Sequence, residues 1–394
     1  MKTSCIDSLW RVITRECLRF YSDRVLLLLV FAMPVVLFTM FCSIYNKGIV
    51  RGLPVAVCDN DNTETSRLLI RAIQSSSSMR LTASLSSAAE LERNIKRGTF
   101  AGGFYFPQGM EQDLKRGHSV HPVVYKNSQN ILIGNYILKE SQSIFRTFNA
   151  GVILKKFKKA GLSTQQALAL VNQITTDVCV LYNPNFNYTQ YMCPGLIFAQ
   201  FQVIIMLCGL LVIAHEREQN TLQLALDNAG GCIGIFLLGK SIPYLSAFCA
   251  VALGILGILF PAFDIKIAGG FWETFVLVLL FVFASFAPGL MLGCLVKDPI
   301  VGTQVAIFIN LPAFIFSGYT FPSGAFPNAL ALIAYVLPFT HFSSAFFKMS
   351  LVHAPLHYAT NEIIALLGFV TIPLVLTWPF IAMQTTRRNA KALV

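Results

Sequence analysis

Few residues of this sequence have the types and spacing needed for chemistry. Gly234 to Ser241 reads GIFLLGKS and fits the phosphate-binding pattern G-x-x-x-x-G-K-[ST]. A phosphate loop follows a strand and presents its backbone N–H groups, whereas four apolar residues fill this pattern, no strand precedes it and a long apolar run follows. We therefore expect no nucleotide here, and we place Lys240 at the level of lipid headgroups, where a cation is favoured.

Metal and redox chemistry are equally weakly signalled. His353 and His357, in the segment HAPLH, have no third ligand nearby in the sequence. The ten cysteines occur singly, without a C-x-x-C pair, so neither a zinc site nor a redox motif is indicated. We expect no metal and no cofactor bound by this chain.

The densest charged motif is HEREQNTLQLAL, His215 to Leu226. The acid–base–acid triplet Glu216-Arg217-Glu218 is followed by Thr221, which caps or opens an amphipathic turn with Leu222, Leu224 and Leu226. Alone, such a motif is typical of a solvated boundary beside a membrane. Its meaning depends on the elements around it.

Composition identifies those elements as membrane helices. The 394 residues are 55% hydrophobic and 12% charged, with a mean hydropathy of +0.62. Soluble domains carry about 25% charged residues, which excludes an ordinary soluble enzyme, a disordered chain and a disulfide-rich secreted module. Six uncharged stretches are long enough to cross a bilayer: Val25–Tyr45, Met192–Ala214, Ile242–Phe263, Thr274–Val296, Ile300–Tyr319 and Ile363–Met383.

The positive-inside rule favours six spans with both termini in the cytoplasm. This topology places eleven Lys and Arg residues inside and two in the short outer loops. A seventh apolar run, Ala329–Phe347, is short and contains Pro338, and counting it as a span would put the basic tail outside. We therefore expect it to form an outer or re-entrant hairpin.

The expected organisation has five parts. Residues 4–22 predict a basic amphipathic helix at the inner membrane surface, with Trp10 on its apolar face and Arg11, Arg15 and Arg19 along another face. Residues 47–190 alternate strands and helices, which predicts an extracytoplasmic α/β domain with two long stalk helices, one from about Asn130 to Lys159 and one begun by Ser163 and Gln166. Ser87 and Glu90 have capping-box spacing. The full division is 1–24 interfacial helix, 25–46 first span, 47–190 outer domain, 191–384 five spans with a cytoplasmic loop 215–231 and outer hairpin 320–350, and 385–394 cytoplasmic tail.

Several stretches, in order, resemble the permease subunits of type-2 ABC exporters, in the branch with a large domain between the first two spans. They are SDRVLLLLVFAMPVVLF, LPVAVCDNDNTETSRLL, RGTFAGGFYFPQGMEQDLKRG, HEREQNTLQLAL, LLGKSIPY and FSGYTFPSGAFPNALALIAYVLPFTHF. The fourth is similar to the family's E-R-E-x-G-T-L-E loop, with Asn220 where Gly is usual and Gln223 where Glu is usual.

The resemblance implies a helical polytopic membrane protein of the cell inner membrane, a permease driven by a separate ABC ATPase that uses the ATP and Mg²⁺. It implies that Glu216, Arg217, Glu218, Thr221 and Leu222 contact that ATPase. We expect charge reversal at Glu216 and Arg217 to release it without harm to folding. Two permeases, identical or related, would pair. A periplasmic membrane-fusion adaptor and an outer-membrane channel are further expected partners; nucleic acid is not.

Polar groups within spans usually face a bundle interior or cavity. The candidate translocation path is therefore lined by Gln200, Gln202, Gln304 and Asn310, with Phe198, Phe201, Phe308 and Phe314, although helix–helix hydrogen bonding and packing explain these residues equally well. Glu273 and Glu362 lie at span ends. Two other functions stay open, an ion-coupled secondary transporter and a membrane receptor with an outer sensing domain. An internal repeat would favour the first and a cytoplasmic signalling module the second.

Overall fold

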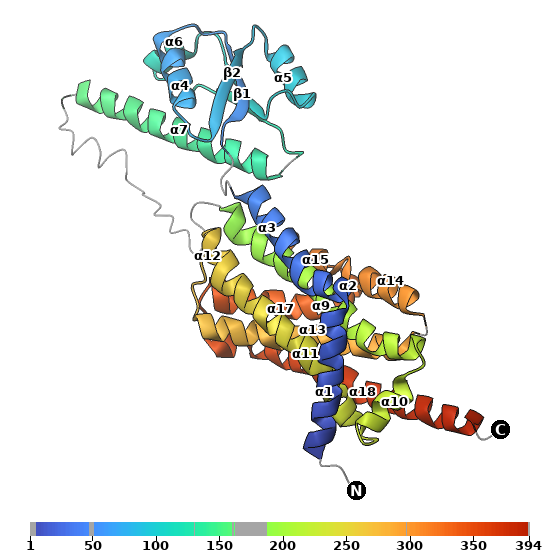
Figure 1. Ribbon diagram of the computed structural model, residues 1–394. Coiled ribbons are helices and arrows are strands. Elements are labelled where there is room, and N and C mark those ends of the chain that lie inside the picture. The colour runs from blue at the N-terminus through green and yellow to red at the C-terminus, as the bar shows by residue number, and fades with distance from the viewer. Residues whose placement is uncertain are drawn as a thin grey trace. The chain divides into compact units, whose positions relative to one another are not determined.

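The computed structural model describes residues 5–46, 51–129, 131–159, 161, 187–296 and 298–392. Contacts divide the chain into two units, one of Met1–Gly48 with Leu181–Val394 and one of Ile49–Val180. The first unit is helical and the second contains the sheet (Figure 1). The fold class is therefore the expected one, a helical polytopic membrane protein with an inserted α/β domain.

Within the described residues, six helical segments are long and apolar enough to cross a membrane. They are Arg24–Tyr45 (α2 Arg24–Leu27, η1 Leu28–Ala32, α3 Met33–Tyr45), Tyr188–Glu218 (α9), Ile233–Ala262 (α11 Ile233–Gly254, η2 Ile255–Leu259, α12 Phe260–Ala262), Phe271–Leu295 (α13), Pro299–Phe316 (α14 Pro299–Asn310, α15 Ala313–Phe316) and Leu356–Met383 (η5 Leu356–Ala359 and most of α18 Thr360–Ala392). The third begins at Ile233 rather than Ile242. Lys240 consequently lies inside a helix, not in the loop before it.

The ambiguous seventh run is a bent pair of helices. α16 (Asn328–Tyr335) and the segment Pro338–Leu351, made of α17 (Pro338–Phe346) and η4 (Phe347–Leu351), meet at 85°. Pro338 stands in the first turn of α17, where its missing N–H costs nothing. A bend of this size fits the expected re-entrant hairpin and not a straight span.

Helices α9 and α13 are in backbone contact. A Cβ added at Gly289 would lie 2.3 Å from the carbonyl oxygen of Met206, and one added at Gly209 would lie 2.6 Å from that of Phe286. Only glycine allows the two helices to approach so closely. The pair forms the centre of the bundle, because both helices are mostly buried.

The second unit is built on a four-stranded sheet of order β2-β1-β3-β4. β1 (Leu53–Asp59) is parallel to β2 (Met79–Ser84) and β3 (Gly102–Phe106), and β3 is antiparallel to β4 (Val123–Lys126). The alternating residues of β1 serve two cores. Val55 and Val57 pack with α4 (Glu64–Gln74), α6 (Met110–Arg116) and α7 (Ile131–Lys159), whereas Ala56 and Cys58 pack with α5 (Ala88–Lys96). Helices therefore cover both faces of the sheet (Figure 1).

The helix starts follow their capping residues. The side chain of Ser87 accepts a hydrogen bond from the N–H of Glu90, as the spacing predicts. The complete reciprocal capping box lies instead at the start of α4, between Thr63 and Ser66. The stalk helix expected from Ser163 and Gln166 lies outside the described residues.

Candidate functional site

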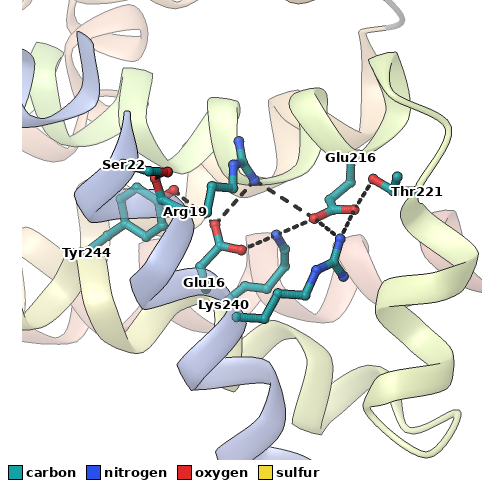
Figure 2. A network of polar contacts seen from close by, with 8 residues as sticks. Glu16, Arg19, Ser22, Glu216, Thr221, Lys240 and Tyr244 are labelled. Carbon is teal, nitrogen blue, oxygen red and sulfur yellow. Dashed lines mark hydrogen bonds and ion pairs between the residues drawn. The ribbon is translucent and has the colours of Figure 1, made fainter. Parts of the chain in front are cut away.

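A buried cluster of charged side chains joins the N-terminal helix to the membrane bundle. α1 (Cys5–Ser22) contributes Arg15, Glu16 and Arg19, the end of α9 contributes Glu216, and α11 contributes Lys240. Figure 2 shows the Lys240 side chain between the two carboxylates. This arrangement connects three segments that are distant in sequence.

Glu216 is the centre of the cluster. Its Oε1 lies 2.9 Å from Nζ of Lys240 and 3.2 Å from Nη2 of Arg15. Its Oε2 accepts a hydrogen bond from the hydroxyl of Thr221, the residue before α10 (Leu222–Asn228). The Glu216 side chain is only 2% exposed, so its charge depends on these partners and not on water.

Glu16 forms the second half of the cluster. Its Oε2 lies 2.5 Å from Nζ of Lys240, and its Oε1 accepts from the hydroxyl of Tyr244 at 2.9 Å and from Arg19 at 3.3 Å. Lys240 is thus shared by two carboxylates from different helices (Figure 2). Its charge is neutralised by protein, which corrects the expectation that it meets lipid headgroups.

Arg217 fastens the end of α9 to the end of α13. Its Nη1 donates to the carbonyl oxygens of Gly293, Cys294 and Val296 at 2.9, 2.7 and 2.8 Å. The last carbonyls of a helix have no hydrogen-bond donor within the helix and carry partial negative charge. A guanidinium supplies both a donor and a positive charge. Arg217 is therefore committed to the bundle. Since Glu216 is committed too, we now expect charge reversal at either residue to damage the fold, contrary to the sequence-based expectation.

The turn after α9 explains one of the two departures from the family pattern, Asn220. Asn220 has a φ of +58°, and the N–H groups of Asn220 and Thr221 bond to the carbonyls of Arg217 and Glu216. This is a Schellman turn, whose left-handed position is usually Gly and next most readily Asn. Asn220 therefore preserves the turn. Gln223, where Glu is usual, donates to Asp227 at 3.3 Å within α10.

The expected amphipathic turn is only partly as predicted. Leu222 and Leu226 are buried, but Leu224 is 58% exposed. Thr221 precedes α10 without capping it, because its hydroxyl is bound to Glu216. Glu218 is exposed and makes no part of the buried cluster. Glu218 and Leu224 are thus accessible, as are Gln219, Asn220, Asp227, Gly230 and Gly231.

Helix α1 has two faces of opposite character. Val12, Glu16 and Phe20 are buried, and a Cβ at Gly239 of α11 would lie 2.7 Å from Val12. Trp10 and Arg11 are exposed on the far side, along with Ile6, Leu18 and Tyr21. An exposed apolar face on a basic helix is what an interfacial helix requires. The sequence places Arg15 and Arg19 with Arg11 along one basic face. In the structure they turn instead toward Glu216 and Glu16.

The predicted path residues fall into three groups. Gln202 and Asn310 are buried and joined by a hydrogen bond between α9 and α14. Phe198 and Phe201 are fully buried in the aromatic core, which contains Phe342 with its ring centroid 4.9 Å from that of Phe198. The remaining four are at least partly accessible: Gln200, Gln304, Phe308 and Phe314. Their role in transport stays a prediction.

Sequence reasoning missed Glu16 and Tyr244 as site residues. A usable signal existed, because Glu16 lies four residues from both Val12 and Phe20 on one helical stripe, where a carboxylate among apolar residues needs a buried cation. The buried cation that Glu16 pairs with, Lys240, is the only charge in a long apolar stretch. Among the described residues, no group of three or more His, Cys, Asp or Glu side chains is placed to hold a metal ion.

Comparison with known proteins agrees with this architecture. Residues 24–378 match the model of the ABC-2 family transporter protein family. The chain is 25% identical over 393 residues to the probable multidrug ABC transporter permease YbhR of Escherichia coli (strain K12), covering 97% of this chain and 96% of YbhR. It is 22% identical over 304 residues to the probable multidrug ABC transporter permease YbhS of the same strain, covering 76% of each. The chain belongs to the ABC-2 transporter family, as the transmembrane subunit of an ABC exporter.

Proposed function

We propose that this permease moves hydrophobic or amphipathic molecules outward across the cell inner membrane, with both termini in the cytoplasm. The distribution of Lys and Arg supports the orientation. The names of YbhR and YbhS, probable multidrug permeases, support the substrate class. Membership of the family implies a separate ABC ATPase and a pair of permeases, identical or related. We further propose a membrane-fusion adaptor and an outer-membrane channel as partners of the α/β domain.

The ATPase would dock on the exposed residues beside the buried charge cluster. Glu218 and Leu224 are accessible. The next residues inward, Glu216 and Thr221, bind to each other, and Glu216 also binds to Arg15 of α1. A push on the loop 215–231 would reach α1 through Arg15 and α11 through Lys240. The observation that carries this proposal is the shared buried ion cluster, because it connects the cytoplasmic loop to three helices at once.

Co-purification tests the docking surface. In cells that express the permease with its ABC ATPase, Glu218→Arg combined with Leu224→Asp should reduce ATPase recovery by at least tenfold, since an interface charge reversed against its partner costs several kcal/mol and each 1.4 kcal/mol is a factor of about ten. Glu92→Arg, a reversal on the exposed helix α5, is the matched control and should leave recovery unchanged. Full recovery with the double variant would remove these residues from the interface.

A transport assay tests the driving force. Proteoliposomes that contain the permease pair and the ATPase should accumulate a fluorescent amphiphile only when ATP and Mg²⁺ are present on the side of the membrane that carries the ATPase. A vesicle with an ion gradient and no ATP should show no accumulation. Transport that persists without the ATPase would identify an ion-coupled carrier instead.

A further inference from the structure

A polar cavity of about 280 Å³ lies between the bent pair of helices and α18. Its wall includes Thr340, His341 and Ser344 of α17, Glu362 of α18, Tyr335 of α16 and Phe326. A neighbouring cavity of about 340 Å³ shares Ser317, Gly324 and Ser344 with it and reaches Lys348. This volume is close to the range of small-molecule sites and far above what one water molecule occupies.

Two buried oxygen atoms in this wall have no hydrogen-bond partner among the described residues, Oε2 of Glu362 and Oγ1 of Thr340. The other carboxylate oxygen, Oε1, accepts from Oγ of Ser344 at 2.9 Å and from Nζ of Lys348. A carboxylate oxygen only accepts, and burial without a donor is costly. The cavity therefore presents an acceptor that calls for a donor from outside the chain.

The local charge and the aromatic wall favour a cationic donor. The side chain of Lys348 is 39% exposed, whereas that of Glu362 is 14% exposed, so solvent screens the cation more than the carboxylate. Tyr335, Phe326 and His341 line the same space, and aromatic faces attract ammonium groups. An ammonium with N–H bonds supplies the donor that Oε2 lacks, which a quaternary ammonium cannot do.

We infer that this cavity, hereafter the Glu362 cavity, binds the primary ammonium group of an amphipathic molecule. The inference rests on the proposed function in treating that molecule as cargo. Glu362, which the sequence places only at a span end, becomes a specificity residue through its unpaired oxygen. Binding itself needs neither ATP nor the ATPase, so it can be measured on the full-length permease alone.

Binding of phenethylamine to the purified permease in nanodiscs provides the test, by saturation-transfer NMR and by the shift in melting temperature. Phenethyl alcohol keeps the ring and loses the charge, and trimethylphenethylammonium keeps the charge and loses the N–H donors. We expect saturable binding of the amine, weakened about tenfold or more for either analogue, because a buried charge-assisted hydrogen bond is lost. Equal binding of the alcohol would overturn the proposal because the charge would not be recognised. No saturable binding of the amine would also overturn it and would leave a cavity that holds water only.

Variants identify the residue responsible. Glu362→Gln should weaken amine binding about tenfold or more, and Thr340→Val should weaken it less while leaving folding intact, since its oxygen has no partner to lose. Glu273→Gln, at the exposed first turn of α13, is the matched control and should bind as the unmodified chain does. Unchanged affinity in both Glu362→Gln and Thr340→Val would refute the site even if transport occurs. Loss of ATP-driven transport with intact amine binding would refute the proposed function and not the site.

Discussion

The ammonium of Lys240 lies 2.9 Å from a carboxylate oxygen of Glu216, and the two side chains are 1% and 2% exposed. One residue belongs to α11 and the other to the end of α9, so a buried ion pair ties two membrane helices together. Glu16 of α1 accepts from the same ammonium. Such a pair resists separation, because each charge left behind would be unpaired in a dry interior.

Lys240→Met should therefore lower the stability of the permease strongly. The change leaves Glu16 and Glu216 with the two arginines of α1 as their cations among the described residues. Removal of one partner of a buried pair costs about 3 to 5 kcal/mol. The melting temperature of the purified protein measures the loss. Lys266→Met is the control, because Lys266 and its partner Asp264 are exposed and 3.9 Å apart. Equal melting temperatures for the two variants would contradict the importance of the cluster.

Asn220 should tolerate Gly and not Ala. Its φ of +58° is free for Gly, whereas Ala loses about 1 kcal/mol in the left-handed region. Asn220→Gly should keep the melting temperature of the unmodified chain and Asn220→Ala should lower it. Gln219→Ala, one residue earlier at a φ of −78°, is the matched control and should change little. An Ala variant as stable as the Gly variant would show that the turn is not held in the Schellman form.

Gln202 and Asn310 should be energetically coupled. Replacement of either by Leu leaves its partner's buried polar group unsatisfied, at a cost of about 0.5 to 2 kcal/mol in a membrane bundle. The double replacement removes both groups and should cost less than the sum of the single changes. A double-mutant cycle on detergent unfolding measures this difference. Strict additivity would mean that the two amides do not interact.

The α/β domain should loosen in acid through Glu111. Hydrogen bonds from Lys115 and from the N–H of Thr65 lower the pKa of Glu111 to about 2 from its ordinary value of 4.5. Because the folded-state pKa is depressed, the ionised carboxylate stabilises the domain above about pH 4.5, and this stabilisation is lost as the pH falls toward 2. The protection factor of the amides at the start of α4, which is the intrinsic exchange rate divided by the observed rate, should therefore fall between pH 4.5 and 3 in the full-length protein.

Glu111→Gln separates this effect from general acid unfolding. The protection factor in the variant should be lower at neutral pH and should no longer fall over that range. Glu92→Gln is the control, since Glu92 pairs with Lys96 of its own helix on an exposed surface and, in the part of the chain that the structure describes, has no recorded bond to another element. A variant that keeps the acid dependence would assign it to another carboxylate.

The sequence predicts the spans and the α/β domain well because both follow from hydrophobic pattern. Uncharged stretches of about 20 residues predict helices such as α9 and α13, and alternation of strands and helices predicts the sheet. The sequence places the start of the third span at Ile242, nine residues after the start of α11 at Ile233, because Lys240 has the character of a membrane boundary. A charge marks a boundary only when water neutralises it, and here two carboxylates do so instead.

The partners within the site could not be predicted from spacing. Glu16 and Lys240 are separated by 224 positions, and nothing local to either residue reveals the contact. The same holds for Arg217, whose carbonyl partners belong to the end of α13. The sequence indicates that the loop 215–231 has a function. It does not indicate which of the loop's charges are paired inside the bundle and which are free to contact a partner protein.

The glycine contact between α9 and α13 limits how this protein can move. Two backbones that touch without intervening side chains have no room to slide or tilt past each other. We therefore expect α9 and α13 to move as one rigid body. We expect a transition that opens a route for cargo to hinge where other helices contact this rigid pair. Those places are the charge cluster shared with α1 and α11 and the Gln202–Asn310 hydrogen bond to α14.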